Sequence, residues 1–270
     1  MKLGATKWSF GRRTYIMGIL NVTPDSFSDG GRYDTLEAAR EQARTLEAVG
    51  ADIIDVGGES TRPGHTPVSA AEEQRRVLPV IEALGDILGI PLSVDTSKAV
   101  VAAAAVGKGA AMINDVWGFR RDPEMASVAA RTGAACCLMH NRQRAEYRDL
   151  CGEIEAELLE SVSIARRAGV EEEQILLDPG IGFGKTPEHN LTVLRQLRRF
   201  TALGYPVLLG ASRKSMIGKV LDLPIEERLE GTLATTVLGI EAGVDVLRVH
   251  NVQANARAAA MADAVLRREA

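Results

Sequence analysis

The chain has 270 residues, of which 46% are hydrophobic and 25% are charged, and its net charge is -4. This balance is ordinary for a globular protein and gives no basic surface for nucleic acid. No stretch approaches the roughly 20 consecutive apolar residues of a membrane helix, and residues 1–18 lack the apolar run of a signal peptide. We therefore expect a cytoplasmic protein that has neither a nucleic acid nor a membrane as its partner.

A short hairpin is predicted ahead of the first long strand. The segments KWSF (7–10) and TYI (14–16) flank a turn at Gly11, Arg12 and Arg13. We expect this hairpin to close the floor of the fold with Trp8 and Tyr15.

Eight short aliphatic runs follow one another along the chain, and each is long enough for one buried strand. In order they are TYIMGILN (14–21), ADIIDVGG (51–58), PLSVDT (91–96), AMINDV (111–116), CCLMH (136–140), ILLDPG (175–180), PVLLGAS (206–212) and VLRVHN (246–251). Stretches with the apolar spacing of helices separate them. Two of these stretches have predicted apolar faces at Leu36, Ala39, Ala43 and Leu46, and at Leu229, Leu233, Val237 and Ile240.

The alternation of strands with helices predicts the fold class. Strands that are apolar throughout indicate a parallel sheet that is covered on both faces. Eight strand–helix units without a break in composition predict one α/β domain over residues 1–270, a single (β/α)8 TIM barrel. The alternative that this pattern leaves open is a doubly wound open sheet.

Each predicted strand ends in polar or charged side chains. In chain order these are Asn21, Asp55, Asp95, Asn114 with Asp115, His140, Asp178, Ser212 with Arg213 and Lys214, and Arg248 with His250. A helix cap explains any single one of them, but not Asp95 or Asp178, because each of these acids ends the apolar strand itself. In a barrel all the strand ends meet at one mouth, so we predict the functional site there.

Three segments at strand ends carry groups that suit an anionic substrate. Arg213 and Lys214 precede a helix whose first amides can bind an anion. Arg248 and His250 lie two apart on the same side of one strand. The third segment, the loop GGESTRPG (57–64), contains hydroxyl groups and an arginine. The structural alternatives are a solvated turn for this loop and a core histidine for His250.

The segment LDPGIGFGKTPEHN (177–190) is similar at first sight to a phosphate-binding loop. A Walker A motif has four residues between its glycines, whereas Gly180 and Gly184 enclose three. The spacing GxGxG also differs from the dinucleotide-binding fingerprint. We therefore predict a glycine-rich turn from strand to helix, with Phe183 at its apex as an apolar wall.

The spacings of cysteine and histidine argue against a disulfide framework and a zinc site. Cys136, Cys137 and Cys151 contain no CxxC pair, and the four histidines form no HxxxH pattern. We predict that the three cysteines are buried thiols.

The stretch MGILNVTPDSFSDGG (17–31) places Asn21 at the end of a strand and Phe27 alone in a loop of turn formers and small polar residues. Together with six later motifs, it closely resembles the dihydropteroate synthases. The motifs are GILNVTPDSFSDGG, DIIDVGGESTRPG, SVDTSK, INDVWG, LDPGIGFGKT, GASRKS and RVHN, and they span nearly the whole chain. The resemblance implies a transferase of folate biosynthesis that joins 6-hydroxymethyl-7,8-dihydropterin pyrophosphate to p-aminobenzoate and releases pyrophosphate.

The resemblance also implies roles for individual residues. The pterin ring would be bound by Asp178, Asp95, Asn114 and Lys214, with Met139 and Arg248 on its two faces. The pyrophosphate would lie against Asn21, Thr61, Arg62, Arg248 and His250. The p-aminobenzoate would lie against Phe27, Arg62, Pro63, Phe183, Lys214 and Ser215. The catalytic residues would be Asp95, Lys214, Arg248 and His250.

Family precedent adds a metal and an order of steps. Asn21 would lend its carbonyl oxygen to a Mg2+ ion that also takes phosphate oxygens. Pyrophosphate would leave first, and Asp95 would stabilise the cation that remains on the pterin. Sulfonamides mimic p-aminobenzoate and would compete with it.

The resemblance implies a homodimer as well, because relatives dimerise through helices near the C-terminal end. Gly231, Ala234, Thr235 and Leu238 offer a small-residue face that is compatible with such a contact.

Three alternative functions compete with this assignment. They are the methyltetrahydrofolate-binding module of cobalamin-dependent methyltransferases, a catalytically silent pterin-binding paralogue, and a P-loop nucleotidase. The chain also departs from many relatives in having Asn251 where they have Asp, and its segment MHNRQRAEYRD (139–149) follows only some of them.

Overall fold

The computed structural model describes residues 1–22, 32–59 and 67–267 of the chain. Its main feature is a sheet of eight strands, each of which is parallel to its neighbours. The strands are β3 (Tyr15–Asn21), β4 (Ile53–Gly57), β5 (Leu92–Asp95), β6 (Met112–Asp115), β7 (Ala135–Met139), β8 (Ile175–Asp178), β9 (Leu208–Leu209) and β10 (Val246–Val249). They pair in the order β8-β7-β6-β5-β4-β3-β10-β9.

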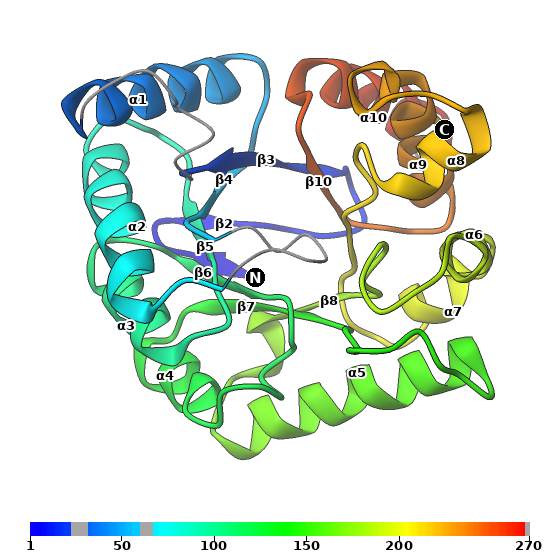
Figure 1. Cartoon of the computed structure of the whole chain (residues 1–270), viewed down its shortest axis with the longest axis horizontal. Coiled ribbons are helices and arrows are strands. Elements are labelled where there is room, and N and C mark those ends of the chain that lie inside the picture. The colour runs from blue at the N-terminus through cyan, green and yellow to red at the C-terminus, as the bar shows by residue number, and fades with distance from the viewer. Residues whose placement is uncertain (23–31, 60–66, 268–270) are drawn as a thin grey trace.

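The two outer strands of this order, β8 and β9, also meet. Leu177 and Val207 form a parallel bridge, and the Leu177 amide donates to the Pro206 carbonyl at 2.9 Å. The sheet therefore closes on itself, with the strands at the centre and the helices around them (Figure 1). The predicted (β/α)8 barrel is confirmed, and the open-sheet alternative is excluded.

Ten helices surround the strands in the described part of the chain. They are α1 (Arg32–Ala48), α2 (Ala70–Gly85), α3 (Ala99–Gly107), α4 (Met125–Thr132), α5 (Leu150–Arg167), α6 (Pro187–Arg195), α7 (Leu197–Thr201), α8 (Ser215–Leu221), α9 (Leu229–Glu241) and α10 (Val252–Leu266), with 3-10 turns η2 (Glu172–Gln174) and η3 (Ile225–Glu227). Side chains of Ser69, Thr186 and Asn251 accept backbone N–H groups and so cap α2, α6 and α10. Asn251 is thus a helix cap in this chain.

The inward-facing side chains change in chemistry from the floor of the barrel to its mouth. Near the floor they are apolar, and they form one cluster of Tyr15, Met17, Ile53, Met112, Ala135, Cys137, Leu176, Leu208 and Val246 with Leu3 and Trp8. Alternate residues of a strand share a face. Two positions after Ile53, Met112, Cys137, Leu176 and Val246, the same faces therefore carry Asp55, Asn114, Met139, Asp178 and Arg248. The register of the barrel thus brings these polar groups to the mouth.

The N-terminal hairpin lies earlier in the chain than predicted. Its strands, β1 (Lys2–Leu3) and β2 (Thr6–Lys7), pair antiparallel around Gly4, which has a positive φ of 58°. The prediction of KWSF and TYI as the two strands was wrong, because Tyr15 pairs with Val246 as the first residue of β3. The predicted floor contact is confirmed, since the rings of Trp8 and Tyr15 stack at 4.2 Å and both are buried.

The predicted apolar face of α1 is confirmed at Ala39, Ala43 and Leu46, which are buried. The predicted face of α9 was wrong at Val237, which is 42% exposed. Ile240 is buried, but most of the other buried side chains of α9 are threonines. A Cβ on Gly239 would lie 2.7 Å from Leu209 Cδ2, so this helix packs too closely on the sheet for large residues there.

The predicted small-residue face of α9 is divided between two sides of the helix. A Cβ on Gly231 would lie 2.3 Å from Ile217 Cγ2, so Gly231 packs against α8 within the chain. Thr235 is buried, and its hydroxyl donates to the Thr232 carbonyl. Of the four predicted residues, only Ala234 and Leu238 are exposed.

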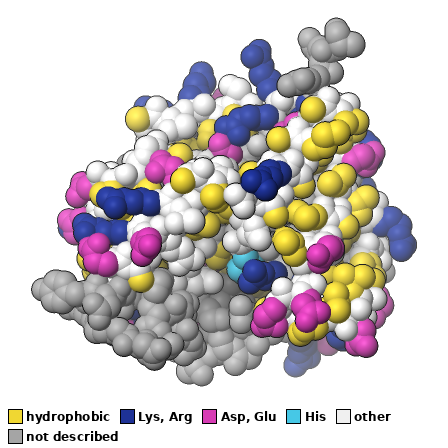
Figure 2. All heavy atoms as spheres, turned by 90° about the horizontal axis from the view of Figure 1, so that it is seen from above, with side chains coloured by type: hydrophobic (Ala, Val, Ile, Leu, Met, Phe, Trp, Pro, Cys, Tyr) yellow, Lys and Arg dark blue, Asp and Glu magenta, His cyan; other side chains and the backbone are white. Residues whose placement is uncertain are grey.

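Exposed large apolar side chains gather on the last three helices. We call this group the apolar patch; its members are Val220 and Leu221 of α8, Val237 and Leu238 of α9, and Met261, Val265 and Leu266 of α10. Figure 2 shows yellow side chains close together at the right of its view, the side on which α8, α9 and α10 lie in Figure 1. Exposed apolar side chains grouped in this way are typical of an interaction site.

The cysteine prediction is confirmed, since all three cysteines are buried and free. Burial raises the pKa of Cys136 and Cys137 above the ordinary value. Among the described residues, no helix is long and apolar enough to span a bilayer.

Candidate active site

Four neighbouring strands end at the same level of the barrel mouth. In the sheet register, Asn21 of β3 lies opposite Gly57 of β4, Gly57 opposite Asp95 of β5, and Asp95 opposite Asn114 of β6. A Cβ on Gly57 would lie 3.6 Å from Asn21 Oδ1 and 3.8 Å from Asp95 Oδ2. The Asn21 amide and the Asp95 carboxylate therefore lie on either side of Gly57.

Arg248 joins two carboxylates at the centre of the mouth. Its Nε donates to Asp55 Oδ2 at 2.7 Å, and its Nη2 donates to Asp95 Oδ2 at 2.8 Å. Asn114 Nδ2 donates to the same Asp55 oxygen at 2.9 Å. Within the described part of the chain, Asp55 Oδ1 and Asp95 Oδ1 are buried without a hydrogen-bond partner. Asp95 is slightly exposed whereas Asp55 is fully buried, so the Asp95 oxygen is the one of the two that is placed to accept a hydrogen bond from a ligand.

The sequence prediction gave Asp55 no role beyond its place at a strand end. In the structure Asp55 is 0% exposed and orients both Arg248 and Asn114. The available signal was its position two residues after the inward-facing Ile53, which predicts a charged group inside the barrel.

Burial controls the protonation of the acids at the mouth. It raises the pKa of Asp95 to about 7, against the opposing charge of Arg248, and it raises the pKa of Asp178 to about 6. Burial alone would lower the pKa of Arg248, but Asp55 and Asp95 raise it overall, so the guanidinium stays charged.

Asp178 ends β8 beside Met139 of β7, and both side chains are buried. Its Oδ1 accepts from the Gly180 amide at 2.7 Å. A Cβ on Gly210 would lie 3.8 Å from Asp178 Oδ2, so the end of β9 lies next to this oxygen. The positive charge of Lys214 favours the ionised form of Asp178.

The turn before α8 brings Lys214 over Phe183. Arg213 has a positive φ of 57°, its amide donates to Thr232 Oγ1 and its carbonyl accepts from Arg228. Lys214 follows as the N-cap residue of α8, which begins at Ser215. Lys214 Nζ lies 4.1 Å from the centre of the Phe183 ring, which is a cation–π contact.

His250 is oriented by Ser212, which follows β9. The hydroxyl oxygen of Ser212 lies 3.0 Å from His250 Nδ1 and accepts from the His250 backbone amide at 3.2 Å. His250 therefore lies at the mouth next to Arg248, and its ring orientation is fixed by Ser212.

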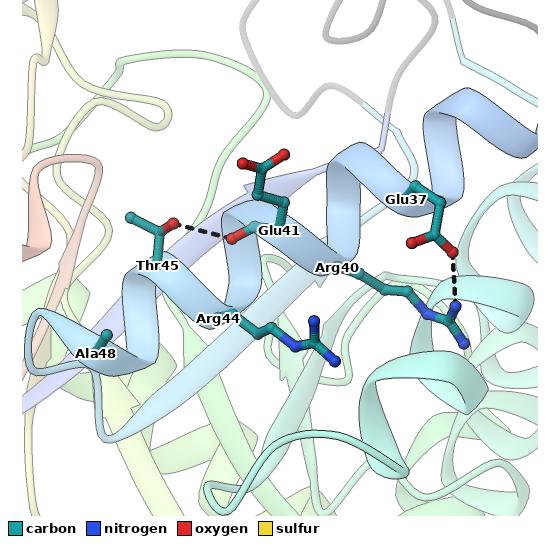
Figure 3. Close-up of a pocket in the computed structure, with 6 residues that line it drawn as sticks. All are labelled: Glu37, Arg40, Glu41, Arg44, Thr45 and Ala48. Atoms are coloured by element: carbon teal, nitrogen blue, oxygen red, sulfur yellow. Dashed lines mark hydrogen bonds and ion pairs between the residues drawn. The ribbon is translucent and has the colours of Figure 1, made fainter.

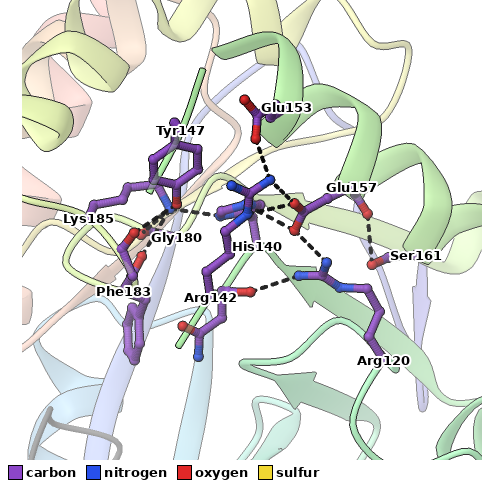
Figure 4. A network of polar contacts seen from close by, with 12 residues as sticks. Arg120, His140, Arg142, Tyr147, Glu153, Glu157, Ser161, Gly180, Phe183 and Lys185 are labelled. Carbon is purple, nitrogen blue, oxygen red and sulfur yellow. Dashed lines mark hydrogen bonds and ion pairs between the residues drawn. The ribbon is translucent and has the colours of Figure 1, made fainter. Parts of the chain in front are cut away.

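Two other strand-end residues lie outside this site. Asp115 accepts from the amides of Trp117 and Phe119 and supports the turn after β6. It does not cap a helix, because α4 begins at Met125 with Glu124 as its N-cap residue. His140 is buried behind the mouth, in the polar network shown in Figure 4.

The structure thus brings together most of the predicted site. Asn21, Asp95, Asn114, Met139, Asp178, Arg248 and His250 lie at the strand ends of the mouth, and Phe183, Lys214 and Ser215 lie beside it in the β8–α6 and β9–α8 connections. The predictions for Phe27, Thr61, Arg62 and Pro63 fall outside the described residues.

A separate hollow of about 580 Å³ lies on the outside of the barrel. Figure 3 shows that its labelled residues, from Glu37 to Ala48, all lie on α1. Arg40 is already paired with Glu37 at 2.6 Å. The hollow is therefore a groove along a single helix and contains none of the strand-end groups.

Comparison with known proteins shows which family has this arrangement of strand ends. A family model described as pterin-binding enzyme matches residues 17–250, a range that contains every strand end described above. A dihydropteroate synthase from Clostridium beijerinckii is 55% identical over 269 residues, which are 99% of this chain and 100% of the relative.

Solved structures agree with the sequence comparison. A dihydropteroate synthase from Clostridium difficile, crystallised in the presence of pteroic acid, has a TM-score of 0.95 at 54% identity and covers 97% of this chain and 100% of its own. The Xanthomonas albilineans enzyme with 4-aminobenzoic acid has a TM-score of 0.90 at 45% identity and covers 94% of each chain. The Yersinia pestis enzyme with a sulfonamide drug has a TM-score of 0.92 at 39% identity and covers 98% of each chain.

Proposed function

This chain belongs to the dihydropteroate synthase family of pterin-binding enzymes, and on that premise we propose how its barrel mouth carries out the family's reaction. It is a transferase that joins 6-hydroxymethyl-7,8-dihydropterin pyrophosphate to p-aminobenzoate and releases pyrophosphate. The observation that carries the assignment to this mouth is the register, which aligns the predicted pterin-binding groups on adjacent strand ends.

The inner part of the mouth is the proposed pterin pocket. A pterin presents a ring N–H next to an exocyclic amine, and one carboxylate can accept from both, which suits Asp178. Asn114 and Asp95 take the remaining polar edge of the ring, and the support for Asp95 is its buried Oδ1, which has no partner among the described residues. Lys214 completes the set from the α8 side, where its charge favours the ionised form of Asp178.

The flat faces of the ring are proposed to lie between Met139 and Arg248. The bonds from Arg248 to Asp55 and Asp95 involve N–H groups, which lie in the plane of the guanidinium. Such bonds fix the plane and leave its faces for stacking on a heterocycle. Met139 is a soft apolar contact for the opposite face.

The pyrophosphate is proposed to lie at the outer rim, against Arg248 and His250 and against Thr61 and Arg62 of the β4–α2 loop. Guanidinium and imidazole groups donate charge-assisted hydrogen bonds to phosphate oxygens. Ser212 supports this role for His250, because it fixes the ring through Nδ1 and so sets the direction of Nε2, the ring nitrogen suited to a phosphate oxygen.

Mg2+ is the proposed cofactor, with Asn21 Oδ1 as the protein ligand. The exposed amide at the end of β3 fits a hard cation that prefers oxygen and keeps water and substrate phosphate as its other ligands. Among the described residues, no group of three or more His, Cys, Asp and Glu side chains could hold a metal ion. When bound, Mg2+ would neutralise charge on the pyrophosphate.

The reaction is proposed to begin with departure of pyrophosphate, which breaks the bond between the pterin methylene carbon and oxygen. The protein's part is to hold the leaving group with Arg248 and His250 and to stabilise the positive charge on the pterin with the Asp95 carboxylate. The neutral aniline nitrogen then attacks the methylene carbon and loses its proton after attack.

The second substrate is proposed to bind between Phe183, Lys214 and Ser215 on one side and Phe27, Arg62 and Pro63 on the other. Lys214 Nζ lies over the Phe183 ring, so a carboxylate there meets both a cation and an apolar wall. Sulfonamides are expected to compete for this pocket, as the drug complex of the Yersinia pestis relative suggests.

The test of function is release of pyrophosphate by the purified enzyme. We expect release only when both substrates and Mg2+ are present, and we expect 7,8-dihydropteroate as the product. A silent pterin-binding paralogue would bind the pterin and release nothing, so binding without release would overturn the assignment.

A homodimer in the cytoplasm is the proposed state of the enzyme. The support for dimerisation is the apolar patch, which spans α8, α9 and α10 near the C-terminal end of the chain. Burying such surface against a second copy is favourable at about 25 cal/mol per Å² of apolar area.

A further inference from the structure

Behind the proposed p-aminobenzoate pocket, a polar network ties the β8–α6 loop to the end of β7 (Figure 4). We propose that Lys185, held by His140, is a positioning residue that fixes the loop carrying Phe183 and so preforms the aromatic wall of that pocket. This inference rests on the proposed role of Phe183.

The Lys185 side chain connects two backbone carbonyl groups of the β8–α6 loop to His140, the residue after β7. Its Nζ lies 3.0 Å from the Gly180 carbonyl oxygen, 3.1 Å from the Phe183 carbonyl oxygen and 2.8 Å from His140 Nδ1. Figure 4 shows these three contacts converging on one nitrogen between the loop and β7. The lysine side chain therefore lies inside its own loop and binds the backbone carbonyl group of Phe183.

The His140 ring is in the form that accepts from this lysine. Glu157 Oε2 lies 3.3 Å from His140 Nε2, so the ring hydrogen belongs on Nε2, which faces the carboxylate. Burial lowers the pKa of His140 to about 4, which keeps the ring neutral and leaves Nδ1 as an acceptor. Three acceptors then surround Lys185 Nζ, and the ammonium form has one hydrogen for each. Burial lowers the pKa of Lys185 to about 7, and the charges of Asp178 and Glu157 oppose that shift.

Arginines on the far side hold Glu157 in place. Arg120 and Arg142 both pair with it, and Arg142 also pairs with Glu153 at 2.7 Å. Burial alone would raise the pKa of Glu157, but the neighbouring His140 ring and the hydrogen bonds from Arg142 and Arg120 lower it overall, so it stays ionised. The chain of contacts therefore runs from α5 through His140 to the loop.

The rest of the loop backbone is held as well. Tyr147 donates its hydroxyl hydrogen to the Gly184 carbonyl at 2.7 Å, and the Gly182 amide donates to Asn190 Oδ1 at 2.7 Å. A Cβ on Gly180 would lie 1.9 Å from the His140 carbonyl oxygen, so the loop lies directly on the end of β7. With backbone groups bound at positions 180, 182, 183 and 184, Phe183 has a fixed position under Lys214.

The proposal predicts different effects on the use of the two substrates. Lys185 binds the loop that bears the p-aminobenzoate wall, whereas the proposed pterin contacts of Asp95, Asn114 and Arg248 lie on other strands. The exception is Asp178, which opens this loop, accepts from Gly180 and is favoured in its ionised form by the charge of Lys185. Displacement of a positioning element by about 1 Å can cost on the order of 100-fold in rate. Loss of Lys185 should therefore weaken use of p-aminobenzoate much more than use of the pterin.

The test is steady-state kinetics of Lys185→Met, which keeps an unbranched apolar stem and removes the donors. The assay is run at about pH 8, where Asp178 is ionised without help from Lys185 because its pKa is about 6. We expect the Michaelis constant for p-aminobenzoate to rise at least about tenfold, and that for the pterin pyrophosphate to change less than about twofold. The control is Lys108→Met, which removes an exposed lysine paired with Glu82 at 2.7 Å and should leave both constants unchanged. Equal increases in both constants for Lys185→Met would overturn the proposal.

A double variant tests whether the effect passes through Phe183. In a Phe183→Ala background, adding Lys185→Met should raise the Michaelis constant for p-aminobenzoate by less than about twofold, because its target is already absent. Full additivity of the two changes would contradict the positioning role.

A second pair of variants covers the case in which Lys185→Met does not fold. His140→Asn keeps an acceptor near the Nδ1 position and should retain the wild-type constants, whereas His140→Leu should reproduce the selective loss. Identical behaviour of these two variants would overturn the proposal. A wild-type enzyme that releases no pyrophosphate would instead refute the proposed function, so the two failures can be told apart.

Discussion

At the scale of single residues, burial and charge set the chemistry of the mouth. Asp178 accepts from Gly180 and is nearly fully buried, and its pKa is raised to about 6 by that burial. An ionised Asp178 can accept from two pterin donors, whereas the protonated acid presents its own hydrogen to one of them. The ionised form is therefore required for binding.

This requirement predicts a pH dependence of pterin binding. Above pH 6 Asp178 is ionised, and below it the affinity should fall by about tenfold per pH unit, the limit for one proton. Asp95, whose pKa is raised to about 7, acts in the same direction. Calorimetry of pterin binding between pH 5 and 8 measures the effect, since these bounds lie roughly one unit beyond the two pKa values.

Asp178→Asn is the matched control for that measurement. It replaces an acceptor by a donor that faces ring donors, so binding should be lost at every pH. A variant with near-normal affinity, or a wild-type affinity that does not change with pH, would contradict the anchoring role of Asp178.

Asp55 allows a second prediction at this scale. It orients two proposed pterin-binding residues, Arg248 and Asn114, and has no proposed contact with the substrate itself. Asp55→Asn removes one charge from the pair with Arg248 and should cost about 1.5–3 kcal/mol of interaction, which lowers pterin affinity. Asp52→Asn is the control, since Asp52 pairs with Arg13 at 2.6 Å near the first residues of β3. Calorimetry should show weaker pterin binding for the first variant alone.

At the scale of elements, glycines decide how closely helices pack. Gly231 of α9 meets α8, where a Cβ would lie 2.3 Å from Ile217 Cγ2 and 3.0 Å from Leu221 Cδ1. At Gly107, the last residue of α3, a Cβ would meet nothing within 4 Å. The same substitution at these two sites should therefore have opposite effects on stability.

We expect Gly231→Ala to lower the free energy of unfolding by about 1–3 kcal/mol, because the α8–α9 contact must open. Gly107→Ala should leave it unchanged or raise it by up to about 1 kcal/mol, since alanine favours the helix. Denaturant unfolding monitored by circular dichroism gives both values. Equal destabilisation by the two changes would show that packing does not set the cost.

At the scale of the whole molecule, the apolar patch predicts association of two copies. Leu238, which is 57% exposed, is the more exposed of its two members on α9, and Leu238→Arg would bury a charge in a dimer interface. We expect this variant to elute as a monomer in size-exclusion chromatography with light scattering, whereas the wild type elutes as a dimer.

Val100→Arg is the control for this prediction, because Val100 is 56% exposed but lies on α3. This variant should remain a dimer. Dissociation by both variants, or by neither, would mean that the patch is not the interface.

The sequence by itself determined the eight strands, their polar ends and the motifs that point to a pterin enzyme. Those features are local, because a buried strand shows as an apolar run and alternate residues share one face. The placement of Asp95, Asn114 and Asp178 at one mouth followed directly from these two rules and is seen in the register.

Only the tertiary structure decided which distant residues meet. Arg248 and Asp55 are 193 positions apart, and Lys185 and His140 are 45 apart, so no local pattern relates them. The hairpin and the buried face of α9 were misplaced for the same reason, since Tyr15 pairs with the distant Val246 and the threonine-rich side of α9 is the one that is buried. Such pairings depend on the closure of the barrel and on the closeness of helix packing, which are properties of the assembled chain.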